Sequence, residues 1–268
     1  MGLFLLKMPH QAERRIAVDC KDVIARLQMK YGRYIIKEEA SQSADFRISK
    51  GEGKLYTVCV GDEAEATSAP IHAISRYLFE HPTYAPEVLA WHGAAVEWKG
   101  RAYVFLAATT TGKTTLTSYL VHSGFGYLTD DCVLLDRATL TVHPFVTPLH
   151  LREGGVAVIR AHDALPNDLA YFSESGGICR YVYTPKNCVE QALPLGEIFL
   201  LERTGDENAL LLLPSNDKLT ALLRAPITPY PLSADYLRFL SGVGKRYGKR
   251  LKYADIDFVK EVIVGYGT

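Results

Sequence analysis

The pattern of apolar and polar positions changes near residue 90, which divides the chain into two regions. Before that point, the periodicity of residues 21–31 predicts a helix, and a second helix is predicted over residues 70–80, from Pro70 to the helix-ending His81-Pro82 pair. Three strand-like runs lie between the two helices, at residues 33–37, 45–50 and 54–61. These elements predict a small α+β region over residues 1–87.

Closely spaced strands dominate the second region, residues 88–268. Lys99-Gly100 separates the apolar runs 89–98 and 102–107, which is the signal of a two-residue hairpin, so these two strands are expected to pair antiparallel. Further strands are predicted at residues 127–129, 132–135, 141–145, 197–201 and 209–213, and helices at residues 217–224, 234–243 and 257–264. The expected fold class is α/β, with a mixed and largely antiparallel arrangement around the strand at 102–107.

That strand runs directly into the segment Ala107-Ala108-Thr109-Thr110-Thr111-Gly112-Lys113-Thr114, which a helix-like run at residues 116–121 follows. A strand, a Gly-Lys-Thr loop and a helix in this order are typical of a phosphate-binding P-loop. Backbone N–H groups and the helix N-terminus surround the phosphates, the lysine neutralises charge, and the threonine hydroxyl holds Mg²⁺. The predicted cofactors are therefore Mg²⁺ and ATP or another nucleoside triphosphate. The predicted binding residues are Ala108, Thr109, Thr110, Thr111, Gly112, Lys113, Thr114 and Thr115.

One position departs from the P-loop pattern. Alanine stands at residue 107, where the pattern has its first glycine. A β-carbon there narrows the backbone conformations that are free of clash. Because of this difference, one alternative remains a protein that binds a nucleotide but does not catalyse a reaction.

Asp130 and Asp131 follow a short apolar strand, 17 residues after Lys113. Carboxylates at a strand end beside a P-loop can hold Mg²⁺ or receive a proton from an attacking hydroxyl. Adjacent side chains of an extended chain point to opposite faces, so only one of the two is expected to face the phosphates. His92 lies on the preceding strand of the hairpin, where a protonated imidazole could contact a phosphate or the catalytic carboxylate. A solvated acidic turn and a structural histidine are the alternatives.

The bulk composition excludes several classes of protein. Thirty basic and thirty acidic residues balance, so there is no basic excess that would indicate a nucleic-acid partner or an anionic membrane. No apolar run has the roughly 18 residues that span a bilayer, and the opening Met-Gly-Leu-Phe-Leu-Leu is too short for the core of a signal peptide. The five cysteines form no C-x-x-C pair and so do not predict a zinc site. The expected location is cytoplasmic.

Several of these motifs together resemble a known family. Trp91-His92-Gly93, the hairpin, Gly112-Lys113-Thr114 and the run Leu128-Thr-Asp-Asp-Cys-Val133 are similar in order and spacing to the C-terminal catalytic domain of HPr kinase/phosphorylase and of the HPr-kinase-related kinases. The resemblance covers roughly residues 88 to 200. It implies a P-loop core of HPr-kinase type, in which the P-loop strand has an antiparallel neighbour. It also implies that Lys113 and the loop amides hold the β-phosphate, Thr114 helps to bind Mg²⁺, Asp130 is the general base, Asp131 assists it, and His92 lies close to the base.

Two regions depart from the family's pattern. The family has a glutamate metal ligand just before an Arg-Gly signature, whereas here Glu153 follows Arg152 and precedes Gly154-Gly155. Glu153 is therefore a metal-ligand candidate beside Thr114 and Asp131, and phosphorylase activity is not predicted. Residues 1–87 do not resemble the N-terminal domain of the bifunctional enzymes. They agree better with the related kinases, which include those that phosphorylate lasso-peptide precursors.

The expected activity is that of an HPr-kinase-like serine kinase, which moves a phosphoryl group from ATP to a hydroxyl. The expected acceptor is a serine of a protein or peptide, either HPr-like or a ribosomally made precursor. Two alternatives remain open: a kinase of free serine or a similar metabolite, and a non-catalytic nucleotide-binding partner protein. The expected partners are the nucleotide and this substrate, with neither nucleic acid nor membrane among them. The sequence does not define an oligomeric state.

Overall fold

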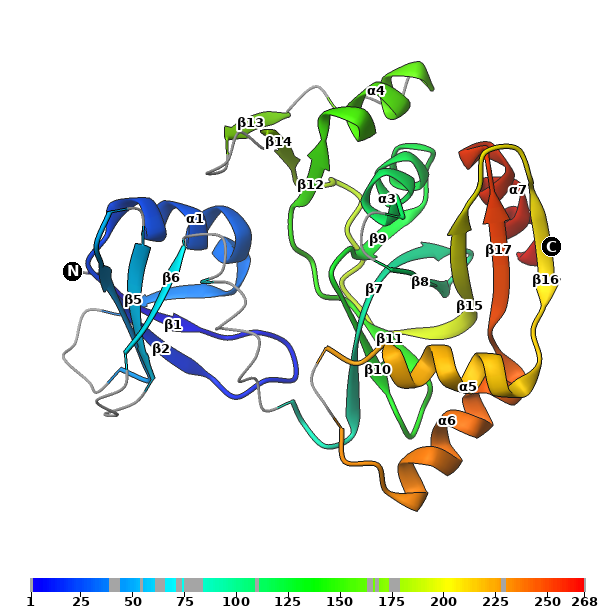
Figure 1. Cartoon of the computed structure of the whole chain (residues 1–268), viewed down its shortest axis with the longest axis horizontal. Helices are drawn as coiled ribbons and strands as arrows, with labels where there is room; N and C mark the ends of the chain where they lie inside the picture. Colours follow the sequence, from blue (N-terminus) through cyan, green and yellow to red (C-terminus); the bar gives the residue numbers. More distant parts are fainter. Residues whose placement is uncertain are drawn as a thin grey trace. The chain divides into compact units, whose positions relative to one another are not determined.

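A computed structural model of the chain describes residues 2–38, 44–53, 55–60, 66–70, 74, 84–108, 111–162, 166, 169–173, 179–227 and 230–267. These residues form two compact units, Met1–Ala85 and Pro86–Thr268 (Figure 1). Helices and mixed sheets occur together in the chain, which gives it a mixed α/β architecture.

The first unit is built on a six-stranded sheet in the order β3-β1-β2-β4-β5-β6. Its helix α1 (Lys21–Tyr31) buries Val23, Leu27 and Tyr31, which recur at intervals of four residues and so lie on one face. The strands are β1 (Gly2–Leu6), β2 (Arg14–Val18), β3 (Ile35–Glu38), β4 (Phe46–Lys50), β5 (Leu55–Val60) and β6 (Ala66–Pro70).

The predicted helix over residues 21–31 and the predicted strands at 45–50 and 54–61 are confirmed in this unit. Strands β1, β2 and β6 were not predicted from the sequence. In β1 the consecutive residues Phe4, Leu5 and Leu6 are all buried, so the alternation that marks a half-buried strand is absent. The predicted helix over 70–80 lies almost wholly outside the described residues.

The second unit contains an eight-stranded sheet and a smaller three-stranded one. The large sheet has the path β11-β10-β7-β8-β15-β17-β16, and β9 pairs with β7. Its strands are β7 (Val88–Trp98), β8 (Arg101–Leu106), β9 (Gly126–Thr129), β10 (Cys132–Asp136), β11 (Thr141–His143), β15 (Leu193–Arg203), β16 (Ala209–Leu212) and β17 (Lys249–Tyr253). The small sheet holds β12 (Leu149–Arg152), β13 (Ala170–Ser173) and β14 (Cys179–Tyr183). The described helices are α3 (Lys113–His122), α4 (Glu153–Ala161), α5 (Ser215–Arg224), α6 (Ala234–Arg246) and α7 (Ile256–Tyr266).

The hairpin of β7 and β8 confirms the prediction made from Lys99-Gly100. The two strands pair antiparallel from Gly93↔Leu106 to Trp98↔Arg101. Lys99 and Gly100 have φ values of 48° and 75°, the positive angles that a two-residue turn of this hand requires at both positions. On its other side β8 pairs with β15 in the parallel sense, so β8 has one antiparallel and one parallel neighbour.

The core of this unit lies on both faces of the large sheet, and β8 contributes to each. Tyr103 and Phe105 pack on one face with α3, α4 and α7, whereas Val104 and Leu106 pack on the other with α5 and α6 (Figure 1). Burying a side chain of this size stabilises the fold by about 1.5–3 kcal/mol. Because β8 is anchored on both faces, the residue at which it ends is well defined.

Long-range packing extends the predicted elements of the second unit and adds new ones. The helix predicted at 116–121 begins at Lys113. Helix α4, strand β17 and the whole of the small sheet were not predicted from the sequence. In β17 the residues Lys249, Arg250 and Lys252 interrupt the apolar pattern, although Leu251 and Tyr253 are buried. Tertiary packing rather than local propensity therefore sets this strand.

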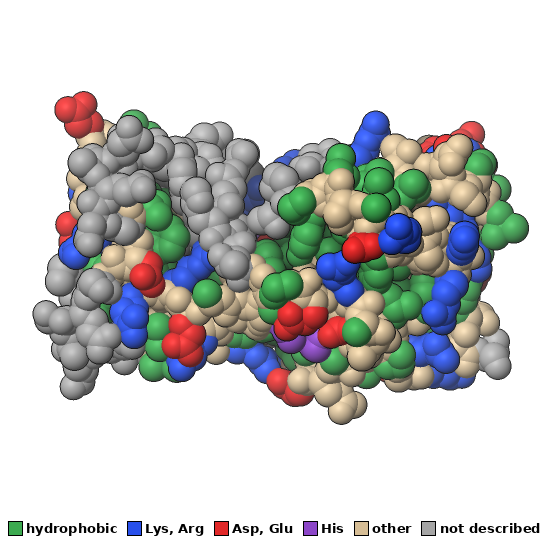
Figure 2. All heavy atoms as spheres, turned by 90° about the horizontal axis from the view of Figure 1, so that it is seen from below, with side chains coloured by type: hydrophobic (Ala, Val, Ile, Leu, Met, Phe, Trp, Pro, Cys, Tyr) green, Lys and Arg blue, Asp and Glu red, His purple; other side chains and the backbone are tan. Residues whose placement is uncertain are grey.

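The described surface is mixed in charge. Figure 2 shows basic and acidic side chains among apolar and uncharged ones on the face that it presents, as expected from thirty residues of each sign. Among the described helices none combines the length and the apolar composition needed to cross a membrane.

Candidate functional site

The predicted phosphate loop connects the end of β8 at Leu106 to the start of α3 at Lys113. Gly112 caps the helix with a left-handed backbone (φ 93°), and it provides no side-chain hydrogen bond to the first turn. A helix whose first N–H groups are not capped by a side chain offers donors and a positive dipole end to an anion. Thr109 and Thr110 lie outside the described residues.

Lys113 is buried at this helix start, with only 7% of its surface exposed. Its Nζ donates hydrogen bonds to the carbonyl oxygens of Ala107 (2.8 Å) and Ala108 (3.2 Å). Burial lowers the pKa of the ammonium group, and the carboxylates of Asp130 and Asp131 oppose that shift. A cation with so little access to water gains strongly from a nearby anion.

The backbone at residue 107 does not need the conformational freedom of glycine, so alanine fits there. Among the described non-glycine residues a positive φ occurs at His10, Lys99 and Leu140, and Ala107 is not one of them. The side chain of Ala107 packs partly buried against the core that contains Phe105 and Leu116. The expected narrowing of backbone conformations therefore causes no strain at residue 107 itself.

Asp130 and Asp131 form a bend between β9 and β10, and both of these strands pair antiparallel with β7. Thr129 lies opposite Ala95, and Cys132 lies opposite His92. On the other side of β7, Leu106 at the end of β8 pairs with Gly93. The phosphate loop and the acidic bend therefore lie at the same point along β7, on opposite sides of that strand.

Glycine is required at residue 93 for this arrangement. A β-carbon there would lie 2.8 Å from the carbonyl oxygen of Phe105 and 2.9 Å from Cδ2 of Leu106. Both distances are shorter than van der Waals contact, so a side chain would displace the end of β8. Gly93 thus keeps the start of the loop close to β7.

The carboxylates of Asp130 and Asp131 both favour the charged form of Lys113, and the expectation that only one of them faces the phosphates stays a prediction. Asp130 is buried (6% exposed) and Asp131 is half-buried, and each favours the charged lysine. The expectation assumed an extended chain, whereas the bend breaks the alternation of side-chain directions. Tyr127 borders the same region: burial, followed by the charges of Asp130 and Asp131, raises its pKa well above the ordinary value.

The side chain of His92 lies beside Asp131 and Lys113. Burial lowers the pKa of the imidazole, Lys113 lowers it further, and the Asp131 carboxylate and a hydrogen bond to the Asp131 backbone raise it. The net shift of the His92 pKa is downward, so the neutral imidazole predominates near pH 7. The family resemblance implied that His92 lies close to Asp130, which stays a prediction. The charged groups that shift the His92 pKa are Lys113 and Asp131.

The remaining predicted residues lie around the first turns of α3 and α4. Thr114 and Thr115 are half-buried in the first turn of α3. A β-carbon at Gly155 would lie 2.6 Å from Oγ1 of Thr115, so this glycine lets α4 approach α3. Glu153 is exposed in the first turn of α4 and is not among the groups that shift the pKa of Lys113 or His92.

Tyr253 contacts the loop from the far end of the sequence and was not predicted. Its hydroxyl donates to the carbonyl oxygen of Thr111 at 2.8 Å, across 142 residues of chain. The same hydroxyl would lie 3.0 Å from a β-carbon at Gly112. The contact fixes the loop just before the helix, and no local signal in the sequence marks Tyr253 for this role.

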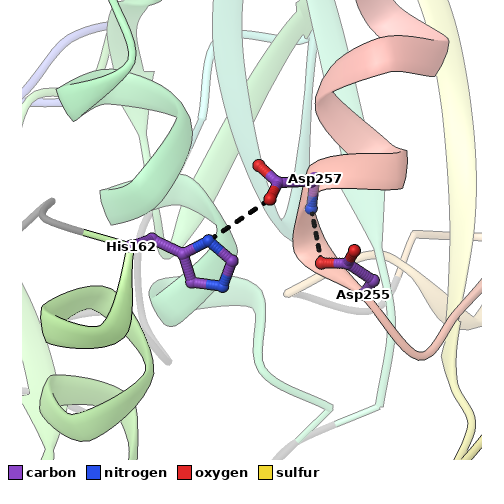
Figure 3. A group of neighbouring side chains, drawn as sticks. All are labelled: His162, Asp255 and Asp257. Carbon is purple, nitrogen blue, oxygen red and sulfur yellow. Dashed lines mark hydrogen bonds and ion pairs between the residues drawn. The ribbon is translucent and has the colours of Figure 1, made fainter.

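Among the residues that the structure describes, one group has the composition of a metal site: His162, Asp255 and Asp257, whose candidate ligand atoms lie within 4.8 Å of one another (Figure 3). Oδ1 of Asp255 accepts the backbone N–H of Asp257 (3.0 Å) and so caps α7. Asp257 accepts a hydrogen bond from the Tyr119 hydroxyl, and its Oδ2 lies 3.4 Å from Nδ1 of His162. Through these contacts Asp255 and Asp257 have a structural role where α3, α4 and α7 meet.

Comparisons with known proteins identify no family. No family model matches the chain, and no curated protein matches it. Solved structures that match include the HPr(Ser) kinase/phosphatase from Coxiella burnetii, with 8% sequence identity over 67% of this chain and 99% of that chain, at a TM-score of 0.32. A likeness of this degree carries no argument about the activity of the chain.

Proposed function

We propose that this protein is an ATP-dependent kinase that transfers a phosphoryl group to a hydroxyl, with a serine of a protein or peptide as the acceptor. The observation that carries the proposal is the buried Lys113 at a helix N-terminus whose cap residue, Gly112, has no side chain, flanked by the carboxylates of Asp130 and Asp131. A buried cation, open backbone donors and nearby carboxylates are what a phosphoryl-transfer site requires. The sequence resemblance to the HPr-kinase-related kinases supports the same activity.

The residues present fit a nucleoside triphosphate and Mg²⁺. Lys113 and the N–H groups of the first turn of α3 would hold the phosphates, because Gly112 contributes no competing side chain. The Thr114 hydroxyl and Asp131 would hold the metal, as oxygen ligands suit Mg²⁺. When bound, the nucleotide supplies the phosphoryl group and Mg²⁺ neutralises its charge.

Asp130 is the proposed general base. It is the more buried of the two carboxylates, and it interacts with Lys113. In this role the Asp130 carboxylate accepts the proton of the acceptor hydroxyl. Before that transfer, the positive charge of Lys113 stabilises the ionised carboxylate. Asp131 and the neutral imidazole of His92 would orient the acceptor and the metal.

A transfer assay tests the proposal. The purified chain is incubated with Mg²⁺ and ATP labelled at the γ-phosphate, together with serine-containing peptides, each paired with its Ser→Ala counterpart, and with free serine in a separate reaction. Label on a peptide serine that the alanine counterpart lacks supports a peptide kinase. The Lys113→Ala chain serves as the inactive control in every reaction.

The other outcomes separate the alternatives. Label on free serine alone would replace the peptide acceptor with a small metabolite. Binding of ATP, measured by calorimetry, without label on any acceptor would indicate a non-catalytic nucleotide-binding partner. The absence of both binding and transfer would overturn the proposed function.

A further inference from the structure

A small cavity of about 120 Å³ opens beside the phosphate loop. Gly112 and Thr115 of the α3 N-terminus form one wall, and Tyr253 and Ile256, where β17 leads into α7, form another. Val158 and His162 at the C-terminal end of α4 close the third side. Because Gly112 and Thr115 border both the helix N-terminus and the cavity, a ligand whose phosphates lie at the loop can extend into it.

The size of the cavity limits its occupant. One water molecule needs about 10–15 Å³ measured in this way, so the space is about ten times that of one water. It suits a single small ring system and excludes a peptide segment or a whole nucleotide. This cavity would therefore take one end of an elongated ligand.

The chemistry of the walls points to a planar heterocycle. Val158 and Ile256 present apolar surface, and the buried ring of Tyr253 adds more. Asp255 places a carboxylate at the rim, where its Oδ1 is engaged with the N–H of Asp257 and its second oxygen points away from that bond (Figure 3). Arg203 also lines the cavity, so the apolar walls carry a hydrogen-bond acceptor at Asp255 and a donor at Arg203. This combination matches a heterocycle that carries an amino group and ring nitrogens.

The charged groups of the cavity are one carboxylate, Asp255, and one guanidinium, Arg203, with the imidazole of His162 in the same lining. Asp257 lies next to this set without lining the cavity. Because both signs of charge occur there, the phosphate end of a ligand is assigned to the buried Lys113 at the start of α3, and the other end extends into the cavity.

We propose that this cavity is the subsite for the nucleobase, and that it takes a purine with an exocyclic amino group. The inference rests on the proposed function, because it assigns the second half of the ligand whose phosphates Lys113 would hold. Asp255 accepts the amino group, and Val158 and Ile256 enclose the ring. The preferred nucleotide is therefore an aminopurine triphosphate, ATP or GTP, rather than a pyrimidine or inosine triphosphate.

The first test separates the base from the phosphates. Val158→Trp fills the cavity, and the neighbouring exposed Ala157→Trp is the matched control on the same helix. Calorimetry measures the binding of ATP and of inorganic tripolyphosphate, each with Mg²⁺. Val158→Trp should weaken ATP binding about tenfold or more while tripolyphosphate binding changes less than about twofold, and Ala157→Trp should leave both unchanged.

A second variant tests the amino-group contact without filling space. Asparagine caps helices as well as aspartate does, so Asp255→Asn keeps the start of α7 but removes the carboxylate charge. The wild-type chain should bind ATP or GTP about tenfold more tightly than inosine triphosphate, and Asp255→Asn should reduce that ratio. Unchanged thermal unfolding midpoints establish that the variants are folded.

Several results would overturn the inference. They are equal affinities of the wild-type chain for ATP and tripolyphosphate, unaltered ATP binding by Val158→Trp, loss of both ligands by folded Val158→Trp, and an undiminished preference in Asp255→Asn. Failure of the proposed function gives a different result. In that case the wild-type chain binds neither ATP nor tripolyphosphate, or Lys113→Ala binds both as tightly as the wild-type chain does. Either result would overturn the nucleobase subsite together with the proposed function.

Discussion

Each unit of the chain contains a lysine among oxygen groups, and the two lysines respond to their surroundings in opposite ways. In the first unit Lys50 lies at the surface, where its Nζ donates to the Tyr56 hydroxyl at 3.2 Å and lies 3.6 Å from Oδ2 of Asp22. These partners raise its pKa, the hydrogen bond with Tyr56 most of all. In the second unit burial is the largest effect on Lys113, and it lowers the pKa although two carboxylates oppose it.

The two lysine clusters differ in how much a bound anion would stabilise them. In the Lys50 cluster the side chains of Lys50 and Asp22 are about half exposed, and both pair with the buried Tyr56 and with each other. The cluster therefore has little to gain from a ligand. The Lys113 cluster holds a cation away from water beside open helix donors, and an anion would relieve that cost. Desolvation, rather than the presence of charged residues, distinguishes the candidate site.

The largest effect is expected from removing the two lysines in turn. Lys113→Ala should lower kcat/KM for transfer at least about a thousandfold, because the charge that holds the phosphates is lost. Lys50→Ala should leave transfer unchanged. Steady-state kinetics with the acceptor identified by the labelling assay measure both. Equal losses in the two variants would remove the distinction between the clusters.

The acidic partners of the two lysines give the next comparison. Asp130→Asn should lower kcat about a hundred- to a thousandfold, because an amide cannot take the acceptor's proton, and should leave nucleotide binding close to the wild-type value. Asp22→Asn should alter neither quantity. Calorimetric binding and single-turnover transfer measure the two effects separately. Wild-type transfer by Asp130→Asn would exclude the general-base role.

A smaller and more local effect concerns the His92 titration. Its pKa lies below the ordinary value of about 6.5, because burial and Lys113 both disfavour the charged imidazole. NMR titration of Lys113→Ala should show a higher His92 pKa than in the wild-type chain, and addition of ATP to the wild-type chain should also raise it. An unchanged His92 pKa in Lys113→Ala would show that the charge of Lys113 does not act on His92.

The same shift has a consequence for stability. Between the lowered folded pKa and the unfolded value of about 6.5, the unfolded chain binds a proton at His92 that the folded chain does not. The contribution of His92 to the free energy of unfolding is therefore fully present above about pH 6.5 and declines as the pH falls through this window. Urea unfolding of wild-type and His92→Asn chains across this range measures the difference.

The sequence predicts the parts of the site that depend on local chemistry. Lys99-Gly100 requires two positive φ angles and so predicts the hairpin, and Gly112-Lys113 after an apolar strand predicts the loop and the helix. The pairing of β7 with β8 brings His92 and the loop to the same end of the sheet. Each of these signals lies within a few residues of the structure that it specifies.

Features set by distant packing could not be predicted in this way. Tyr253 meets Thr111 only because β17 joins the sheet through β15, which is itself a parallel neighbour of β8. The bend at Asp130 exists because β9 and β10 both pair with β7, whereas the local pattern favours a continuous strand with opposed side chains. Long-range strand pairing decides both, and one sequence does not encode it locally.

The smallest effect is expected at Ala107, where the chain departs from the P-loop pattern. Its backbone is not left-handed, so the β-carbon costs the loop nothing that a glycine would restore. Ala107→Gly should change kcat/KM by less than about twofold and lower the free energy of unfolding by about 0.4–1 kcal/mol, because glycine gains freedom in the unfolded chain. Kinetics and urea unfolding test both expectations, with the exposed Ala157→Gly as the control for stability. A large gain in rate would show that alanine strains the loop, and the Lys113 site would then be an impaired P-loop rather than one adapted to alanine.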